Sequence, residues 1–141
     1  MKLKKYNKYL NKLIDYAVVC DVKVIYKNIP QDEGSFSYSD RTIELDENLS
    51  ESNEIATFLH ELGHFIDDAL HPKFTRSKKA EAAYYSYNCA VPLTKPQRKV
   101  ILDQERRAWE GGEGLARQLK IKLGKWYYKE MKEGLNAYRK G

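Results

Sequence analysis

The sequence predicts a single α+β domain over residues 1–141, with helices packed around a small antiparallel sheet. Three observations lead to this fold class. Apolar residues near the start recur at helical spacing, β-branched residues dominate short segments between residues 22 and 45, and amphipathic segments fill the rest of the chain. At 141 residues, with 42% apolar and 32% charged side chains, the chain is long enough to bury one core and too short for two ordinary domains.

The N-terminal part of the chain predicts a helix, a strand and a hairpin, in that order. Apolar residues every three or four positions predict an amphipathic helix over residues 2–17. Residues 22–26 are rich in strand formers and end before Pro30, which predicts a strand. Residues 35–38 and 42–45 each alternate apolar with polar side chains on either side of a polar turn, so they are expected to form a hairpin with one buried face.

A long helix is expected next, over residues 51–70. Ser50 or Ser52 suits its N-cap, and the acidic residues that follow suit the positive end of the helix dipole. The helix must end by Pro72, because proline cannot continue it. Further helices are expected over residues 79–88, 97–122 and 125–139.

The segment His60-Glu61-Leu62-Gly63-His64 lies within this long helix. The two histidines are four residues apart, so their imidazoles lie on one face of the helix and can bind one tetrahedral metal ion. Glu61 is rotated by about 100° from His60, beside the ion, where it can take a proton from the attacking water. Gly63 leaves room for a neighbouring backbone or a substrate. Such a short pattern also occurs by chance, but here it uses two of the three histidines in the chain. It predicts Zn²⁺ as the cofactor and Glu61 as the catalytic base.

The third metal ligand must come from another part of the chain, because a catalytic zinc site has three protein ligands and one open position. Glu105 is the leading candidate, since it lies on an otherwise apolar stripe of a later helix and is costly to bury without a partner. The alternative for Glu105 is a surface acid that pairs with a neighbouring arginine. Asp67 is almost two turns from His60 and is better suited to support the ligands, as is Asp68. His71 is expected to be an ordinary loop histidine.

These features together resemble a known class of enzymes. His-Glu-Leu-Gly-His after a hairpin, followed by Glu-x-x-Ala at residues 105–108, resembles the gluzincin branch of zinc peptidases. The order of elements over about residues 2 to 120 is similar to the compact, zincin-like metallopeptidase domain of the ImmA/IrrE family. The zinc helix also resembles that of the anthrax lethal factor-type peptidases.

The resemblance implies a role for each matching residue. His60, His64 and Glu105 correspond to the metal ligands and Glu61 to the general base. Trp109 stands where such families often have Asn or an acid, so Glu110 is the second candidate for the third ligand. The family is associated with phages, mobile elements and stress responses, and its characterised members cut DNA-binding repressors. The resemblance therefore implies a zinc-dependent endopeptidase that acts on a protein or peptide, with a repressor as one candidate.

Two further features of the catalytic reaction are expected. The strand over residues 42–45 is an edge on which an extended substrate can add as a further strand. Tyr84, Tyr85 and Tyr87 lie between the two ligand-bearing helices and are candidates to stabilise the oxyanion, although each is individually expected to be a packing or surface tyrosine. The alternative function, from another class, is a zincin-like binding or regulatory module without peptidase activity.

Composition and charge also limit the expected cellular location and the expected partners. The net charge is +5, but the lysines are spread along helix-like segments and no nucleic-acid-binding motif accompanies them, so nucleic acid is not expected as a partner. The first residues lack the apolar segment of a secretory signal, and no apolar run is long enough for a membrane span. A cytoplasmic protein is therefore expected, with Cys20 and Cys89 as free thiols that pack in the core.

Overall fold

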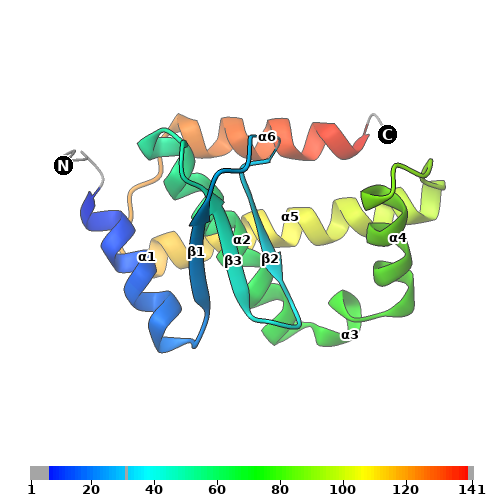
Figure 1. Cartoon of the computed structure of the whole chain (residues 1–141), viewed down its shortest axis with the longest axis horizontal. Coiled ribbons are helices and arrows are strands. Elements are labelled where there is room, and N and C mark those ends of the chain that lie inside the picture. Colours follow the sequence, from blue (N-terminus) through cyan, green and yellow to red (C-terminus); the bar gives the residue numbers. More distant parts are fainter. Residues whose placement is uncertain (1–6, 31, 140–141) are drawn as a thin grey trace.

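The structure is a computed structural model that describes residues 7–30 and 32–139. Residues 2–6 of the first predicted helix lie outside the described residues. The elements follow in the order α1 (Asn7–Val19), β1 (Lys23–Lys27), β2 (Gly34–Ser37), β3 (Thr42–Asp46), α2 (Glu51–Leu70), α3 (Pro72–Thr75), α4 (Lys78–Asn88), α5 (Lys95–Gln118) and α6 (Lys125–Arg139) (Figure 1). The α+β fold class is thus confirmed.

The three strands form one mixed sheet, in the order β1-β3-β2. β2 and β3 form the predicted antiparallel hairpin, with Phe36 opposite Ile43. β1 pairs with β3 in parallel, with Val24 opposite Ile43. The prediction of an antiparallel sheet is therefore wrong for β1. The chain reverses direction between β1 and β2 and again between β2 and β3, so β3 runs in the same direction as β1. Since β3 lies between the other two strands, it pairs with β1 in parallel.

The position of β3 also corrects the predicted docking edge. β3 is the central strand and is paired on both sides, so it has no free edge for a substrate. β2 is the edge strand on the hairpin side of the sheet. The side-chain pattern along a strand predicts which face is buried, whereas the order of strands depends on contacts between distant parts of the chain.

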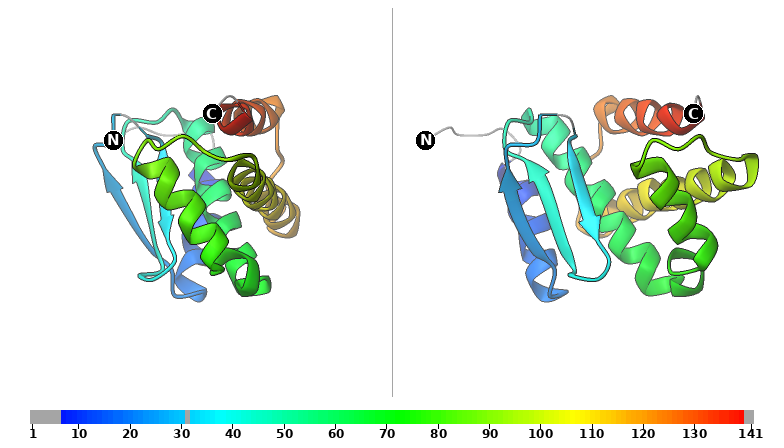
Figure 2. Two further views of the ribbon diagram at one scale, coloured as in Figure 1. Left: turned by 90° about the vertical axis from the view of Figure 1, so that its right-hand side faces the viewer. Right: turned by 45° about the vertical axis from the view of Figure 1, so that its right-hand side comes forward.

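The core lies between the sheet and helix α2, which crosses behind the strands, while α5 and α6 lie on the far side of α2 (Figure 2). Alternate residues of β3 point to this helix, and Ile43 and Leu45 are fully buried. They belong to the same cluster as Ile55, Phe58 and Leu62 of α2. Burial of each such side chain stabilises the folded state by about 1.5–3 kcal/mol. The apolar face of α2, opposite its histidines, therefore anchors the helix against the sheet.

The ends of α2 and α5 follow from local sequence signals. The hydroxyl of Ser50 accepts a hydrogen bond from the backbone N–H of Asn53, so Ser50 is the N-cap of α2. The helix ends at Leu70, before Pro72, as predicted. α5 begins with a capping box at Thr94 and ends four residues earlier than predicted, because Lys120 adopts a left-handed conformation (φ 59°) and terminates the helix.

Two smaller expectations have mixed outcomes. Cys20 and Cys89 are free thiols, as expected, but Cys89 is exposed, so its predicted place in the core is wrong. Among the helices of the described ranges, none combines the length and the apolar character that a membrane span requires.

Candidate metal centre

Helices α2 and α5 approach each other closely enough for their backbones to touch. A Cβ atom added to Gly63 would lie 1.8 Å from the carbonyl oxygen of Ala108. One added to Gly112 would lie 2.6 Å from the carbonyl oxygen of Leu59. Small residues at these positions therefore permit the crossing, and the crossing places Glu105, one helical turn before Ala108, beside the histidine face of α2.

Three side chains converge at this crossing. His60 Nε2 lies 3.0 Å from Glu105 Oε1, and His64 Nε2 lies 3.1 Å from Glu105 Oε2. The three groups can offer ligand atoms that all lie within 4.8 Å of one another, and no other such cluster occurs among residues 7–30 and 32–139. Two candidate ligands from α2 and one from α5 thus meet, although His60 and Glu105 are 45 residues apart in sequence.

The donor set and its spacing suit a small divalent ion. Two imidazole nitrogens and one carboxylate oxygen are ligands that zinc accepts in catalytic sites. Ligand atoms about 2.0–2.1 Å from a tetrahedral ion are roughly 3.3 Å apart. The two histidine-to-carboxylate separations of 3.0 and 3.1 Å are close to this value, and the ligand atoms of all three groups lie within 4.8 Å of one another, so the donor set fits such an ion.

The charges within the cluster depend strongly on one another. Burial alone would raise the pKa of Glu105, but His64 and His60 hold it well below its ordinary value. Burial alone would lower the pKa of His64, but the carboxylate of Glu105 raises it to about 9. Without a metal ion, protonated His64 and ionised Glu105 therefore form an internal ion pair, and the proton on the imidazole takes the place of a metal cation.

Glu61 lies next to this cluster without being part of it. Its side chain is only 5% exposed, and Oε2 lies 3.4 Å from His60 Nδ1. Burial raises the pKa of Glu61, while His60 and His64 act in the opposite direction and leave a net increase. A carboxylate with a raised pKa beside a metal site is suited to accept a proton near neutral pH.

Trp109 fixes the orientation of the first histidine. Its indole stacks on the imidazole of His60, with ring centroids 4.1 Å apart and an interplanar angle of 6°. Trp109, which directly follows the Glu-x-x-Ala pattern, is therefore a wall of the site. Glu110, the second candidate for the third ligand, is exposed and is not one of the clustered residues.

The other acidic candidates pair with arginines. Asp67 is buried and accepts a hydrogen bond from Arg107 Nε at 2.8 Å, which ties α2 to α5. Asp68 accepts two hydrogen bonds from the guanidinium of Arg76. His71 is an exposed residue stacked on a phenylalanine, as expected for a loop histidine.

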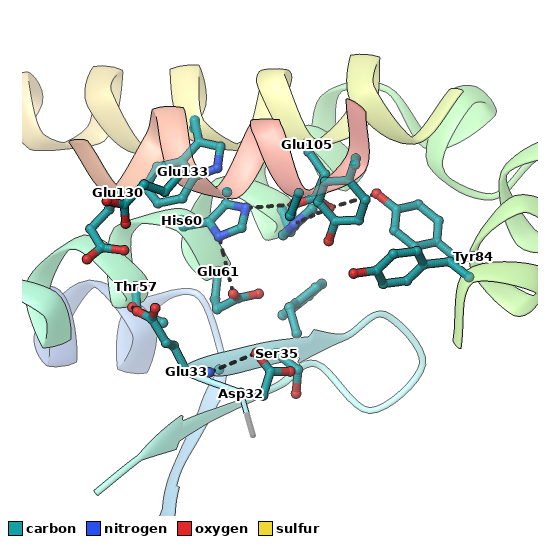
Figure 3. Close-up of a pocket in the computed structure, with 18 of the residues that line it drawn as sticks. Asp32, Glu33, Ser35, Thr57, His60, Glu61, Tyr84, Glu105, Glu130 and Glu133 are labelled. Atoms are coloured by element: carbon teal, nitrogen blue, oxygen red, sulfur yellow. Dashed lines mark hydrogen bonds and ion pairs between the residues drawn. The ribbon is translucent and has the colours of Figure 1, made fainter. Parts of the chain in front are cut away.

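A cavity of about 580 Å³ opens in front of the cluster, between the hairpin and helices α4 and α6 (Figure 3). Tyr84 lines it and donates a hydrogen bond to Glu105 Oε2 at 2.7 Å. Of the other two candidate tyrosines, Tyr87 also lines the cavity but is 41% exposed, and Tyr85 is 71% exposed and does not line it. The structure therefore distinguishes the three candidate tyrosines, because only Tyr84 contacts the metal cluster.

Several residues around the cavity were not expected from the sequence. The hydroxyl of Tyr38 lies 3.1 Å from His64 Nδ1, and Gln104 contacts that same hydroxyl. A group of carboxylates lines one end of the cavity, namely Asp32, Glu33, Glu130 and Glu133 (Figure 3). No local motif marks these residues, because they come from three separate parts of the chain, namely residues 32–38, Gln104 and residues 130–133. The position of Gln104 directly before Glu105 on an apolar stripe was the only available signal.

The fold and the side-chain cluster define a metallopeptidase-like α+β domain. Residues 19–102 match the IrrE N-terminal-like domain, which is a peptidase family, and the chain belongs to this family. The predicted relationship to the ImmA/IrrE family is thus confirmed. The matched segment includes His60, Glu61 and His64 and ends three residues before Glu105. No curated protein and no solved structure shows a significant match to the chain.

Proposed function

We propose that this protein is a zinc-dependent endopeptidase in which His60, His64 and Glu105 bind the metal. The observation that carries the proposal is the convergence of these three side chains, with buried Glu61 beside them, at the wall of one cavity. Membership of a peptidase family supports the same chemistry. A zinc ion held there would supply the Lewis acidity that activates a water and polarises the scissile carbonyl.

In this proposal Glu61 is the general base. Its carboxylate accepts a proton from the attacking water and later delivers it to the leaving amine. Burial favours the reversible protonation that these two steps require, because it raises the pKa of the carboxyl. A metal that only stabilised the fold would not need a carboxylate at this position.

The free edge of β2 is the proposed docking strand for the substrate. Asp46 donates a backbone hydrogen bond to Glu33, so this pair is of the hydrogen-bonded type. Because the two types alternate along an antiparallel ladder, the N–H and C=O groups of Gly34 and Phe36 point away from β3. Both residues line the cavity, and an extended peptide can pair with them beside the metal ligands.

Tyr84 is the proposed donor to the oxyanion. Its hydroxyl lies at the metal cluster and lines the cavity, and burial with the nearby charge of Glu105 raises its pKa well above the ordinary value. The group therefore stays protonated throughout the physiological range, and once its single proton turns away from Glu105 it can donate a hydrogen bond to negative charge that develops on the carbonyl oxygen.

The substrate is proposed to be a protein, as membership of a peptidase family suggests. A DNA-binding repressor of a phage or mobile element is one candidate, and this suggestion rests on the family resemblance alone. The alternative is a regulatory binding module that uses the same fold without hydrolysis. The two functions differ in whether a zinc-loaded protein cuts peptide bonds.

Zinc titration of ligand variants tests the proposal. We expect about one zinc per chain in the wild type, and a Glu105→Ala variant that binds zinc at least tenfold more weakly. Glu110→Ala is the matched control, since this acid is exposed on the same helix and should leave the affinity unchanged. Unaltered zinc binding by Glu105→Ala would refute the ligand assignment, and a zinc-loaded wild type that cuts no peptide in a diverse library would favour the binding module.

A further inference from the structure

Tyr38 contacts the side of His64 that faces away from Glu105. It lies in the turn between β2 and β3, and its hydroxyl is 3.1 Å from Nδ1 of His64. The other ring nitrogen, Nε2, is the one that lies 3.1 Å from Glu105. The two nitrogens of His64 therefore have different partners, and in a neutral imidazole only one of them can carry the proton.

Gln104 completes the chain of contacts. Its side chain is 1% exposed, it precedes Glu105 on α5, and its carboxamide lies 2.8 Å from the hydroxyl of Tyr38. With the NH₂ group toward Tyr38, the carbonyl oxygen of Gln104 is buried without a hydrogen-bond partner among the described residues. In this orientation the hydroxyl of Tyr38 accepts a hydrogen bond from the NH₂ group of Gln104 and also contacts His64. A buried carbonyl without a partner costs about 1–3 kcal/mol.

Rotation of this carboxamide by 180° removes the conflict. Gln104 Oε1 then accepts the proton of Tyr38, and the hydroxyl oxygen of Tyr38 is free to accept the Nδ1–H of His64. The rotated NH₂ group needs an acceptor, and the buried Oδ2 of Asp67 has no hydrogen-bond partner in the part of the chain that the structure describes. Asp67 lies one turn after His64 and binds Arg107, one turn after Gln104, so it belongs to the same contact between α2 and α5.

We propose that Tyr38 and Gln104 are positioning residues that hold the proton of His64 on Nδ1, so that Nε2 presents its lone pair to the metal. The inference rests on the proposed zinc site and adds the groups that orient one of its ligands. Hydrogen bonds from the far nitrogen of a metal-binding histidine commonly fix its tautomer and ring orientation. The same contacts join the turn that follows the docking strand β2 to the two ligand-bearing helices. They therefore hold the strand at a fixed position relative to the metal ligands.

Zinc affinity, measured by competition with a chelator, tests the proposal without reference to activity. Tyr38→Phe removes only the hydroxyl, and we expect its dissociation constant for zinc to rise about 10- to 100-fold. Gln104→Leu removes the acceptor oxygen and the donor NH₂ group together, and we expect its dissociation constant for zinc to rise as well. Tyr128→Phe is the matched control, because this tyrosine is exposed and bonds Glu113 away from the cavity.

Ring ¹⁵N spectra of zinc-loaded wild-type protein provide a second readout that needs no variant. We expect the proton of His64 on Nδ1, in slow exchange with water, and faster exchange of this proton in Tyr38→Phe. A proton on Nε2, or wild-type zinc affinity in Tyr38→Phe, would overturn the proposal while leaving the zinc site intact. Wild-type zinc affinity in Gln104→Leu would overturn the acceptor role of Gln104. A wild type that binds no zinc would overturn the proposed function itself.

Discussion

The carbonyl oxygen of Ala108 lies 1.8 Å from the point that a Cβ of residue 63 would occupy. Gly63 lies between the two histidines of the first motif, directly before His64. Ala108 is the last residue of the second motif, Glu-x-x-Ala. Two short patterns far apart in sequence therefore meet at a single backbone contact. This contact explains why a glycine and a small residue accompany the metal ligands, and it sets the distance between α2 and Glu105.

Substitution of Gly63 by alanine tests this contact. Alanine in a helix is normally favoured over glycine by about 1 kcal/mol, but here the methyl group would collide with backbone. We expect Gly63→Ala to destabilise the protein by about 2 kcal/mol or more and to weaken zinc binding, because α5 must move away. Urea unfolding and chelator competition measure the two effects.

Gly114 is the matched control for this substitution. It lies on α5, and a Cβ added there would meet nothing within 4 Å. Gly114→Ala should therefore stabilise the protein by about 0.5–1 kcal/mol. Equal effects of the two substitutions would show that the close helix contact does not determine stability.

The zinc affinity should depend on pH through His64. In the metal-free protein its pKa is raised from 6.5 to about 9, so the ion pair with Glu105 contributes stability fully below pH 6.5 and loses it as the pH rises through about 9. Zinc must displace this proton. We therefore expect the affinity to rise about tenfold per pH unit between pH 6.5 and 9 and to level off above that range. Chelator competition at a series of pH values measures the slope, and a flat profile would contradict the proposed ion pair.

Removal of the Tyr84 hydroxyl should impair turnover more than binding. Tyr84→Phe deletes the proposed donor to the oxyanion, so we expect kcat to fall about 10²- to 10³-fold with little change in KM. The measurement uses the best-cleaved peptide of a fluorescence-quenched library. Tyr85→Phe is the control, because this tyrosine is 71% exposed outside the cavity and should keep wild-type kinetics.

The acidic end of the cavity should favour cationic substrates. Burial, together with the nearby charges of Glu33 and Glu133, raises the pKa of Glu130, and no lysine or arginine among residues 7–30 and 32–139 lines this cavity. We expect peptides with Lys or Arg near the scissile bond to be cut more efficiently than peptides with Glu. Glu133→Gln should reduce this preference about two- to fivefold, and Glu110→Gln should not. Equal rates for both peptide sets in the wild type would refute the charge preference.

The sequence was sufficient for the parts of this site that depend on helical spacing. His60 and His64 share a face because they are four residues apart, and the buried carboxylate at residue 105 follows from a polar residue on an apolar stripe. The parallel pairing of β1 with β3 was not predictable, since it arises from strand order. Tyr38 was missed because the alternating pattern marks it as an apolar residue of the strand predicted over residues 35–38, and that pattern does not show which distant side chain its hydroxyl contacts. The single domain and the cytoplasmic location stay predictions.

The most direct test of the account compares wild-type protein with Glu61→Gln at equal zinc content. Glutamine has nearly the same shape as glutamate but cannot accept the proton, so the variant should keep the zinc and the thermal stability of the zinc-loaded wild type. We expect its rate of peptide hydrolysis to fall about 10²- to 10⁴-fold. Hydrolysis at the wild-type rate by fully zinc-loaded Glu61→Gln would contradict the proposed mechanism.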